Sequence, residues 1–197
     1  MTRITSCFVI LVPEFDAQCN EKRSCAADSQ WPTQAASQYN KWHDENFFWT
    51  GEPVFDNEKK GIVRDVTKEI GGVIYDKKID FMSNHRKSYK QLSDDYNYLR
   101  IGEIENSINQ REIYFIPKEK ISGIYDKLQT GDVIGITSNL KGLDIAHTGF
   151  VYMQDGVAYL LNASLKNKQV EISQVDLQEY VMSNSKQGGI VVARVIE

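Results

Sequence analysis

The sequence predicts an α+β domain in which helices come first and an antiparallel sheet follows. Ile101, Ile104 and Ile108 recur at intervals of three and four residues, which is the apolar stripe of a helix. Further along, Asp155-Gly156 separates two apolar runs and is a strong signal for a β-hairpin. Additional strand-like runs follow this hairpin towards the C-terminus.

The predicted elements are short and lie between turn signals such as Gly71-Gly72 and Gly131-Asp132. In chain order they are a strand or turn within 61–70, a strand over 73–75, a helix over 81–92, a helix from about 98 to 110, a strand over 113–116 that stops at Pro117, a helix over 122–128, strands over 133–137, 147–153, 157–162 and 168–172, a helix over 177–182 and a strand over 189–195. In the helix over 177–182, Leu177, Tyr180 and Val181 are expected to pack inward.

Residues 1–53 form a segment with neither helical nor strand periodicity between Glu14 and Asn46. Such a segment is typical of a linker, a disordered arm or a sequence not selected for folding. We therefore divide the chain into an irregular segment, 1–53, and an α+β domain, 54–197.

Composition limits the classes of partner. The chain has 197 residues, 41% of them hydrophobic, and a net charge of -4, which favours a folded domain and argues against nucleic acid as the main partner. No apolar run is long enough for a membrane span. The N-terminal stretch from Phe8 to Val12 is shorter than the core of a signal peptide, so we expect no working export signal. The oligomeric state is not predicted.

The three cysteines, Cys7, Cys19 and Cys25, all lie near the N-terminus. Their spacing lacks the paired close ligands of structural zinc sites, so we expect neither a metal nor a cofactor. A disulfide with one remaining thiol and a catalytic cysteine both stay open.

His147 is the histidine best placed for chemistry, because it opens a predicted strand directly after a loop. His43 and His85 are interpreted as surface residues. The predicted hairpin places the start of its first strand beside the end of its second, so Asn162 is expected beside His147. An imidazole oriented by an amide suits a thiol hydrolase, although a structural histidine and a strand-terminal asparagine are equally simple explanations.

Motifs in a fixed order and spacing carry a resemblance from Val54 to Ile196. They are Phe55–Gly61, Asp65-Val66-Thr67, Tyr114–Lys118, Thr130–Ile134, Gly142–Gly149, Leu161–Ser164 and Gly189–Val195. This pattern resembles the N-acetylmuramoyl-L-alanine amidase-like family, a branch of the papain-like NlpC cysteine peptidases of bacterial envelopes. The resemblance implies a papain-like fold, peptidoglycan peptides or muropeptides as substrates, a location in the cell envelope, His147 as general base and Asn162 as its orienting group.

The sequence departs from that family at the nucleophile, which should lie in an Asp-Cys-x-Thr-Phe segment at a helix start. The nearest counterpart is Ser6-Cys7-Phe8-Val9, which lacks the acid and the threonine, so Cys7 is the candidate nucleophile of an impaired enzyme. A shifted reading frame in the first half of the gene would explain the departure. A catalytically silent binder of cell-wall peptides, a truncated product without function and a metal-dependent amidase are the alternatives.

Overall fold

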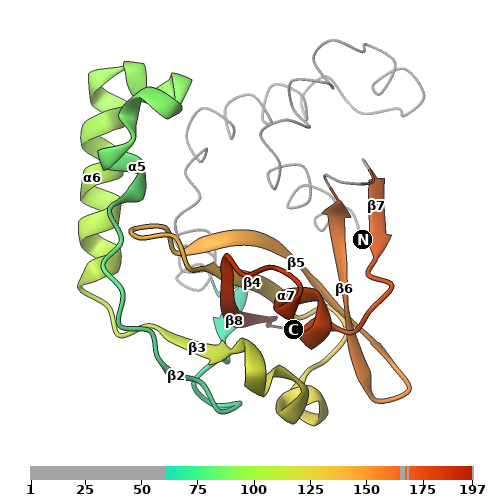
Figure 1. The fold of residues 1–197 in the computed structure, drawn as a ribbon. Coiled ribbons are helices and arrows are strands. Elements are labelled where there is room, and N and C mark those ends of the chain that lie inside the picture. Colours follow the sequence, from blue (N-terminus) through green and yellow to red (C-terminus); the bar gives the residue numbers. More distant parts are fainter. Residues whose placement is uncertain (1–60, 165–166, 168, 197) are drawn as a thin grey trace. The chain divides into compact units, whose positions relative to one another are not determined.

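The computed structural model describes residues 61–164, 167 and 169–196 (Figure 1). The chain divides into two units, of which the larger comprises Phe48–Asn162 and Ile172–Glu197. The described residues of the smaller unit are 163–164, 167 and 169–171. The predictions for residues 1–53, including those for Cys7, Cys19, Cys25 and His43, lie outside the described residues.

Helices and antiparallel strands make up the described chain, which confirms the predicted α+β class. The strands are β1 (Val63–Asp65), β2 (Val73–Ile74), β3 (Tyr114–Pro117), β4 (Val133–Ser138), β5 (Ile145–Gln154), β6 (Val157–Ser164), β7 (Gln169–Ile172) and β8 (Gln187–Val195). The helices are α5 (Phe81–Asn84), α6 (Asp95–Asn109) and α7 (Leu177–Met182), with 3₁₀ segments η2 (Arg86–Ser88), η3 (Lys90–Ser93) and η4 (Lys118–Lys127). Within the described ranges, no helix combines the length and the apolar character needed to cross a membrane.

A sheet with the order β2-β3-β8-β4-β5-β6 lies at the centre of the larger unit, and β1 also pairs with β8. The strand pairs are antiparallel, as in β4 and β5, where Ile136 lies opposite His147. Strands β5 and β6 form the predicted hairpin. Asp155 and Gly156 have φ angles of 51° and 80°, which are the left-handed values that a two-residue type I′ turn requires.

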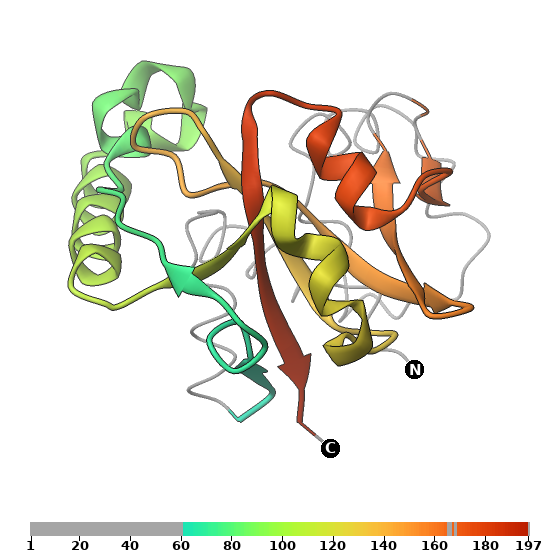
Figure 2. The same ribbon diagram turned by 60° about the horizontal axis from the view of Figure 1, so that its bottom comes forward.

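The segments η4 and α7 lie over one face of this sheet, as Figure 2 shows. The main core lies between them and the sheet. Alternate residues of the strands point into it, because the side-chain period of a strand is two. The sheet contributes Ile116, Ile134, Ile136, Val151, Ala158, Leu160, Ile190 and Val192, while η4 and α7 contribute Ile121, Ile124, Leu177 and Val181. Burial of these aliphatic side chains is the principal favourable term in folding of this unit.

A second apolar cluster joins α5, η3 and α6, and it includes the predicted stripe Ile101, Ile104 and Ile108. The buried carboxylate of Glu105 accepts hydrogen bonds from the backbone N–H groups of Met82, at 2.9 Å, and Ser83, at 3.3 Å. Glu105 thereby supplies acceptors for the orphan donors at the start of α5.

The predicted helix over 81–92 is wrong, since α5, η2 and η3 are three short segments. Tyr89 has extended φ and ψ angles of -121° and 109°, which interrupt a helix there. The bend still brings Met82 and Leu92 into the same cluster, so the apolar spacing is satisfied by a folded path rather than by one helix.

Candidate active site

His147 and Asn162 meet on neighbouring strands of the hairpin, with the imidazole Nε2 and the amide Oδ1 3.0 Å apart. Both side chains lie on the sheet face that carries the main core: His147 lies opposite core residue Ile136, and Asn162 follows core residue Leu160 by two positions. Asn162 is 1% exposed and His147 is half-buried. The predicted contact between these two residues is confirmed; their catalytic role stays a prediction.

A β-bulge lies directly before His147. Ile136 pairs with His147, whereas Thr137 pairs with Ile145, so Ala146 is an extra residue on β5. A bulge of this kind bends the strand and changes the direction of its side chains. Here it turns Ile145 to the face opposite that of His147, although the two residues are two positions apart, and the sequence pattern does not reveal it.

The loop before the bulge is tied to an earlier part of the chain. Lys77 Nζ donates to the carbonyls of Ser138, at 2.5 Å, and Leu143, at 2.7 Å. The Gly142 carbonyl accepts from the backbone N–H groups of Asp80 and Phe81, both at 3.0 Å. Burial lowers the pKa of Lys77, in spite of the nearby carboxylate of Asp144. These bonds fix the start of β5 and with it the position of His147.

Tyr180 of α7 is a third member of the site. Its hydroxyl donates to Asn162 Oδ1 at 3.4 Å, and its ring lies against the imidazole with centroids 6.5 Å apart and an interplanar angle of 24°. The sequence predicts Tyr180 only as a packing residue, which the partly buried ring confirms. No local pattern indicates its hydrogen bond, because α7 and β6 meet only in the folded structure.

The hydrogen bonds of Asn162 determine which nitrogen of His147 is basic. Nδ2 donates to the Leu160 carbonyl at 3.4 Å, which leaves Oδ1, an acceptor only, facing the imidazole. Nε2 therefore carries a proton, and Nδ1 can accept another. Burial lowers the pKa of His147, and the hydrogen bond with Asn162 opposes that effect. A neutral imidazole with one free basic nitrogen can act as a general base near neutral pH.

Two other candidates among the described residues, His85 and Asp132, do not join this site. His85 is exposed, stacks on Phe81 with ring centroids 4.0 Å apart and bonds the Phe81 carbonyl through Nδ1 at 2.7 Å. This local arrangement confirms its interpretation as a surface histidine. Asp132, from the predicted turn, is 2% exposed and binds Arg194 through two hydrogen bonds of 2.8 and 2.7 Å, so its role is structural.

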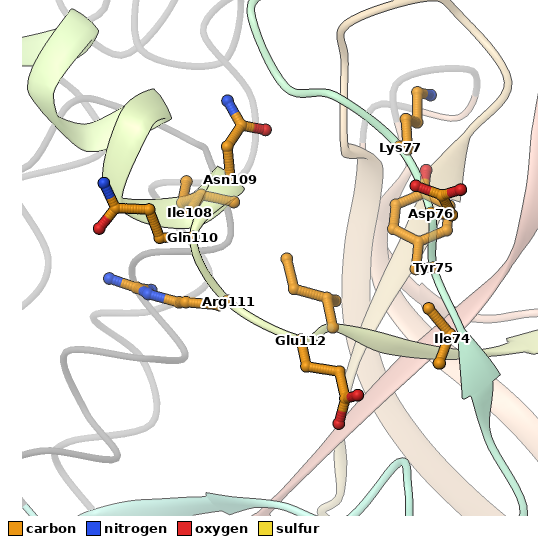
Figure 3. Close-up of a pocket in the computed structure, with 10 residues that line it drawn as sticks. Ile74, Tyr75, Asp76, Lys77, Ile108, Asn109, Gln110, Arg111 and Glu112 are labelled. Atoms are coloured by element: carbon orange, nitrogen blue, oxygen red, sulfur yellow. The ribbon is translucent and has the colours of Figure 1, made fainter.

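Two hollows of the described surface lie away from the imidazole. One, of about 320 Å³, lies between the residues that follow β2 and the end of α6 (Figure 3). Lys77 contributes to its wall, but its amine points away from Gln110 and Arg111 in Figure 3. The other hollow lies between α6 and residues 78–84. Across the described ranges, His, Cys, Asp and Glu side chains form no group of three that could hold a metal ion.

Comparisons with known proteins agree on one family. Residues 35–190 match the family described as N-acetylmuramoyl-L-alanine amidase-like (AmiA-like). The match therefore begins upstream of Val54, the residue at which the resemblance of the sequence motifs begins. Two crystal structures of an N-acetylmuramoyl-L-alanine amidase from Bacteroides uniformis are similar at 32% identity, with TM-scores of 0.68 and 0.69. In each, the similarity covers 73% of this chain and 62% of the amidase, so this chain spans less than two thirds of its relative's length.

A further similar structure, from Bacteroides fragilis, is described as a proposed xylanase. It shares 26% identity with a TM-score of 0.67, and the similarity covers 72% of this chain and 62% of the other. No curated protein matches the sequence significantly. With a family match over most of its length and an amidase relative of the same fold, this chain belongs to the N-acetylmuramoyl-L-alanine amidase-like family.

Proposed function

We propose that this protein acts on the peptide part of bacterial peptidoglycan, with His147 as general base and Asn162 as the group that orients it. The observation that supports this best is the 3.0 Å contact between the imidazole and the amide, at the end of a sheet of the amidase fold. In a cysteine amidase of papain-like type, a thiolate attacks the amide carbonyl carbon. The imidazole accepts the thiol proton and later delivers it to the leaving amine.

The nucleophile is the weakest part of such a site in this chain. The three cysteines, at positions 7, 19 and 25, all precede residue 35, so the stretch that matches the family contains none. We infer that catalysis is impaired and that Cys7 is the remaining candidate for the attacking thiol. Muropeptides are the expected partners, and the cell envelope is the expected location.

A glycosidase is a poorer explanation of the same geometry. Glycoside hydrolases ordinarily use two carboxyl groups on either side of the glycosidic bond. The trio His147, Asn162 and Tyr180 supplies an imidazole, an amide and a phenol instead. The alternative function that remains is a catalytically silent module that binds cell-wall peptides.

The two functions are separated by incubating the purified chain with muropeptides and measuring both cleavage and binding. If the protein is an enzyme, mass spectrometry should detect cleavage products, and these products should disappear in Cys7→Ala and in His147→Ala. If the protein is a silent binding module, calorimetry should detect binding by the unmodified chain and by both variants, and none of the three should cleave muropeptides. Absence of both binding and cleavage would contradict either function.

A further inference from the structure

Two donors converge on one oxygen at the candidate site. Asn162 Oδ1 accepts from His147 at 3.0 Å and from the Tyr180 hydroxyl at 3.4 Å, and the amide is 1% exposed. We propose that Tyr180 is a positioning residue, whose hydroxyl holds the Asn162 amide against the His147 imidazole. The importance of Tyr180 for catalysis rests on the proposed function, whereas its hydrogen bond to Asn162 does not depend on that function.

Leu160 and Tyr180 act on different properties of this amide. The Leu160 carbonyl can only accept, so it binds the Nδ2 end and decides which end of the amide faces His147. A hydroxyl can donate or accept, and for that reason Tyr180 would bond either end. Tyr180 therefore limits the rotation of the amide about its Cβ–Cγ bond, without choosing its orientation.

Tyr180 is held in place by the packing and the N-cap of α7. Its neighbours Leu177 and Val181 are fully buried in the main core. The N-cap of α7, Asp176, accepts from the Tyr125 hydroxyl at 2.9 Å, and that hydroxyl accepts from the Gln178 N–H at 3.0 Å. Because α7 is anchored both by its apolar face and by its cap, the phenol is presented to the amide from a rigid support.

The test measures hydrogen exchange of the His147 Nε2 proton by NMR in the full chain. Tyr180→Phe removes one hydroxyl, so the amide leaves the imidazole more often. The exchange rate should rise by at most about five-fold, the factor for one ordinary hydrogen bond, because the 3.4 Å contact is longer than usual. The protonated nitrogen should remain Nε2, because the Leu160 carbonyl still orients the amide.

Tyr152→Phe is the matched control, since Tyr152 lies on β5 with His147 but points to the other face of the sheet. Asn162→Ala should accelerate exchange more than Tyr180→Phe does. The proposal is overturned if Tyr180→Phe exchanges like the natural protein, or if Tyr152→Phe accelerates exchange equally. Faster exchange in Tyr180→Phe without any muropeptide cleavage by the natural protein would support the positioning role and refute the enzymatic one.

Discussion

Replacing Gly142 with alanine should destabilise the protein more than any replacement of a glycine in open space. Gly142 has a φ of +81°, a left-handed value that costs a residue with a side chain about 1–2 kcal/mol. A Cβ atom there would lie 2.4 Å from Asp80 Oδ1 and 3.0 Å from the Phe81 nitrogen. Relieving such overlaps in a packed region costs about 1–3 kcal/mol more. The expected loss in the free energy of unfolding is therefore about 2–5 kcal/mol.

Two other glycines separate the contributions. Gly156 has a φ of +80° but nothing within 4 Å of an added Cβ, so Gly156→Ala should cost only the backbone part, about 1–2 kcal/mol. Gly102 lies in α6 with open space around it, and Gly102→Ala should stabilise by about 1 kcal/mol through helix propensity.

Urea unfolding followed by circular dichroism measures all three variants under one condition. A loss in Gly142→Ala no larger than that in Gly156→Ala would refute the steric part of the reasoning. Adding Asp80→Ala to Gly142→Ala should recover part of the loss, because it removes the nearer of the two contacts. No recovery would place the strain at the backbone of Phe81 instead.

Three further predictions concern buried polar groups. Arg194→Ala leaves the Asp132 carboxylate without its guanidinium and should lower the unfolding free energy by about 2–4 kcal/mol in chemical denaturation; an unchanged value would mean that the pair does not stabilise the fold. Glu105→Leu removes the acceptor of the Met82 N–H and should cost about 1–3 kcal/mol, and Glu105→Gln should cost less because its amide oxygen still accepts; equal losses contradict the capping role. Burial lowers the pKa of His147 below its ordinary value of 6.5, so the unfolded chain binds this proton more readily. The contribution of His147 to stability is therefore complete above pH 6.5 and is lost as pH falls towards the folded pKa. Between about pH 7.5 and about pH 5.5 the natural protein should lose more stability than His147→Gln, and a larger loss in the variant would contradict this sign.

The elements predicted correctly are those whose signals are local. The Asp155-Gly156 turn and the apolar runs beside it fix the β5–β6 hairpin, and pairing across that hairpin predicts the contact of His147 with Asn162. The stripe at Ile101, Ile104 and Ile108 likewise predicts α6, which begins three residues before its predicted start near Tyr98.

The features that sequence reasoning misses depend on distant parts of the chain. The end of α5 at Asn84 is missed because the chain becomes extended at Tyr89 and packs back against Ile101 and Ile104 of α6, which local spacing does not reveal. The bulge at Ala146 is a shift of one residue between β4 and β5, which leaves the apolar pattern unchanged. The Tyr180 contact arises only when α7 docks on the sheet.

The origin of both polar groups in a single hairpin has a consequence for how the chain tolerates change. His147 and Asn162 are separated by 15 residues, so closing their contact orders only a short loop. Insertions elsewhere in the chain leave this spacing intact, so the hairpin keeps the two groups in the same relative position. A single-residue deletion within β6 is different, because shifting the alternation by one position would turn the carboxamide to the opposite side of the sheet from the imidazole.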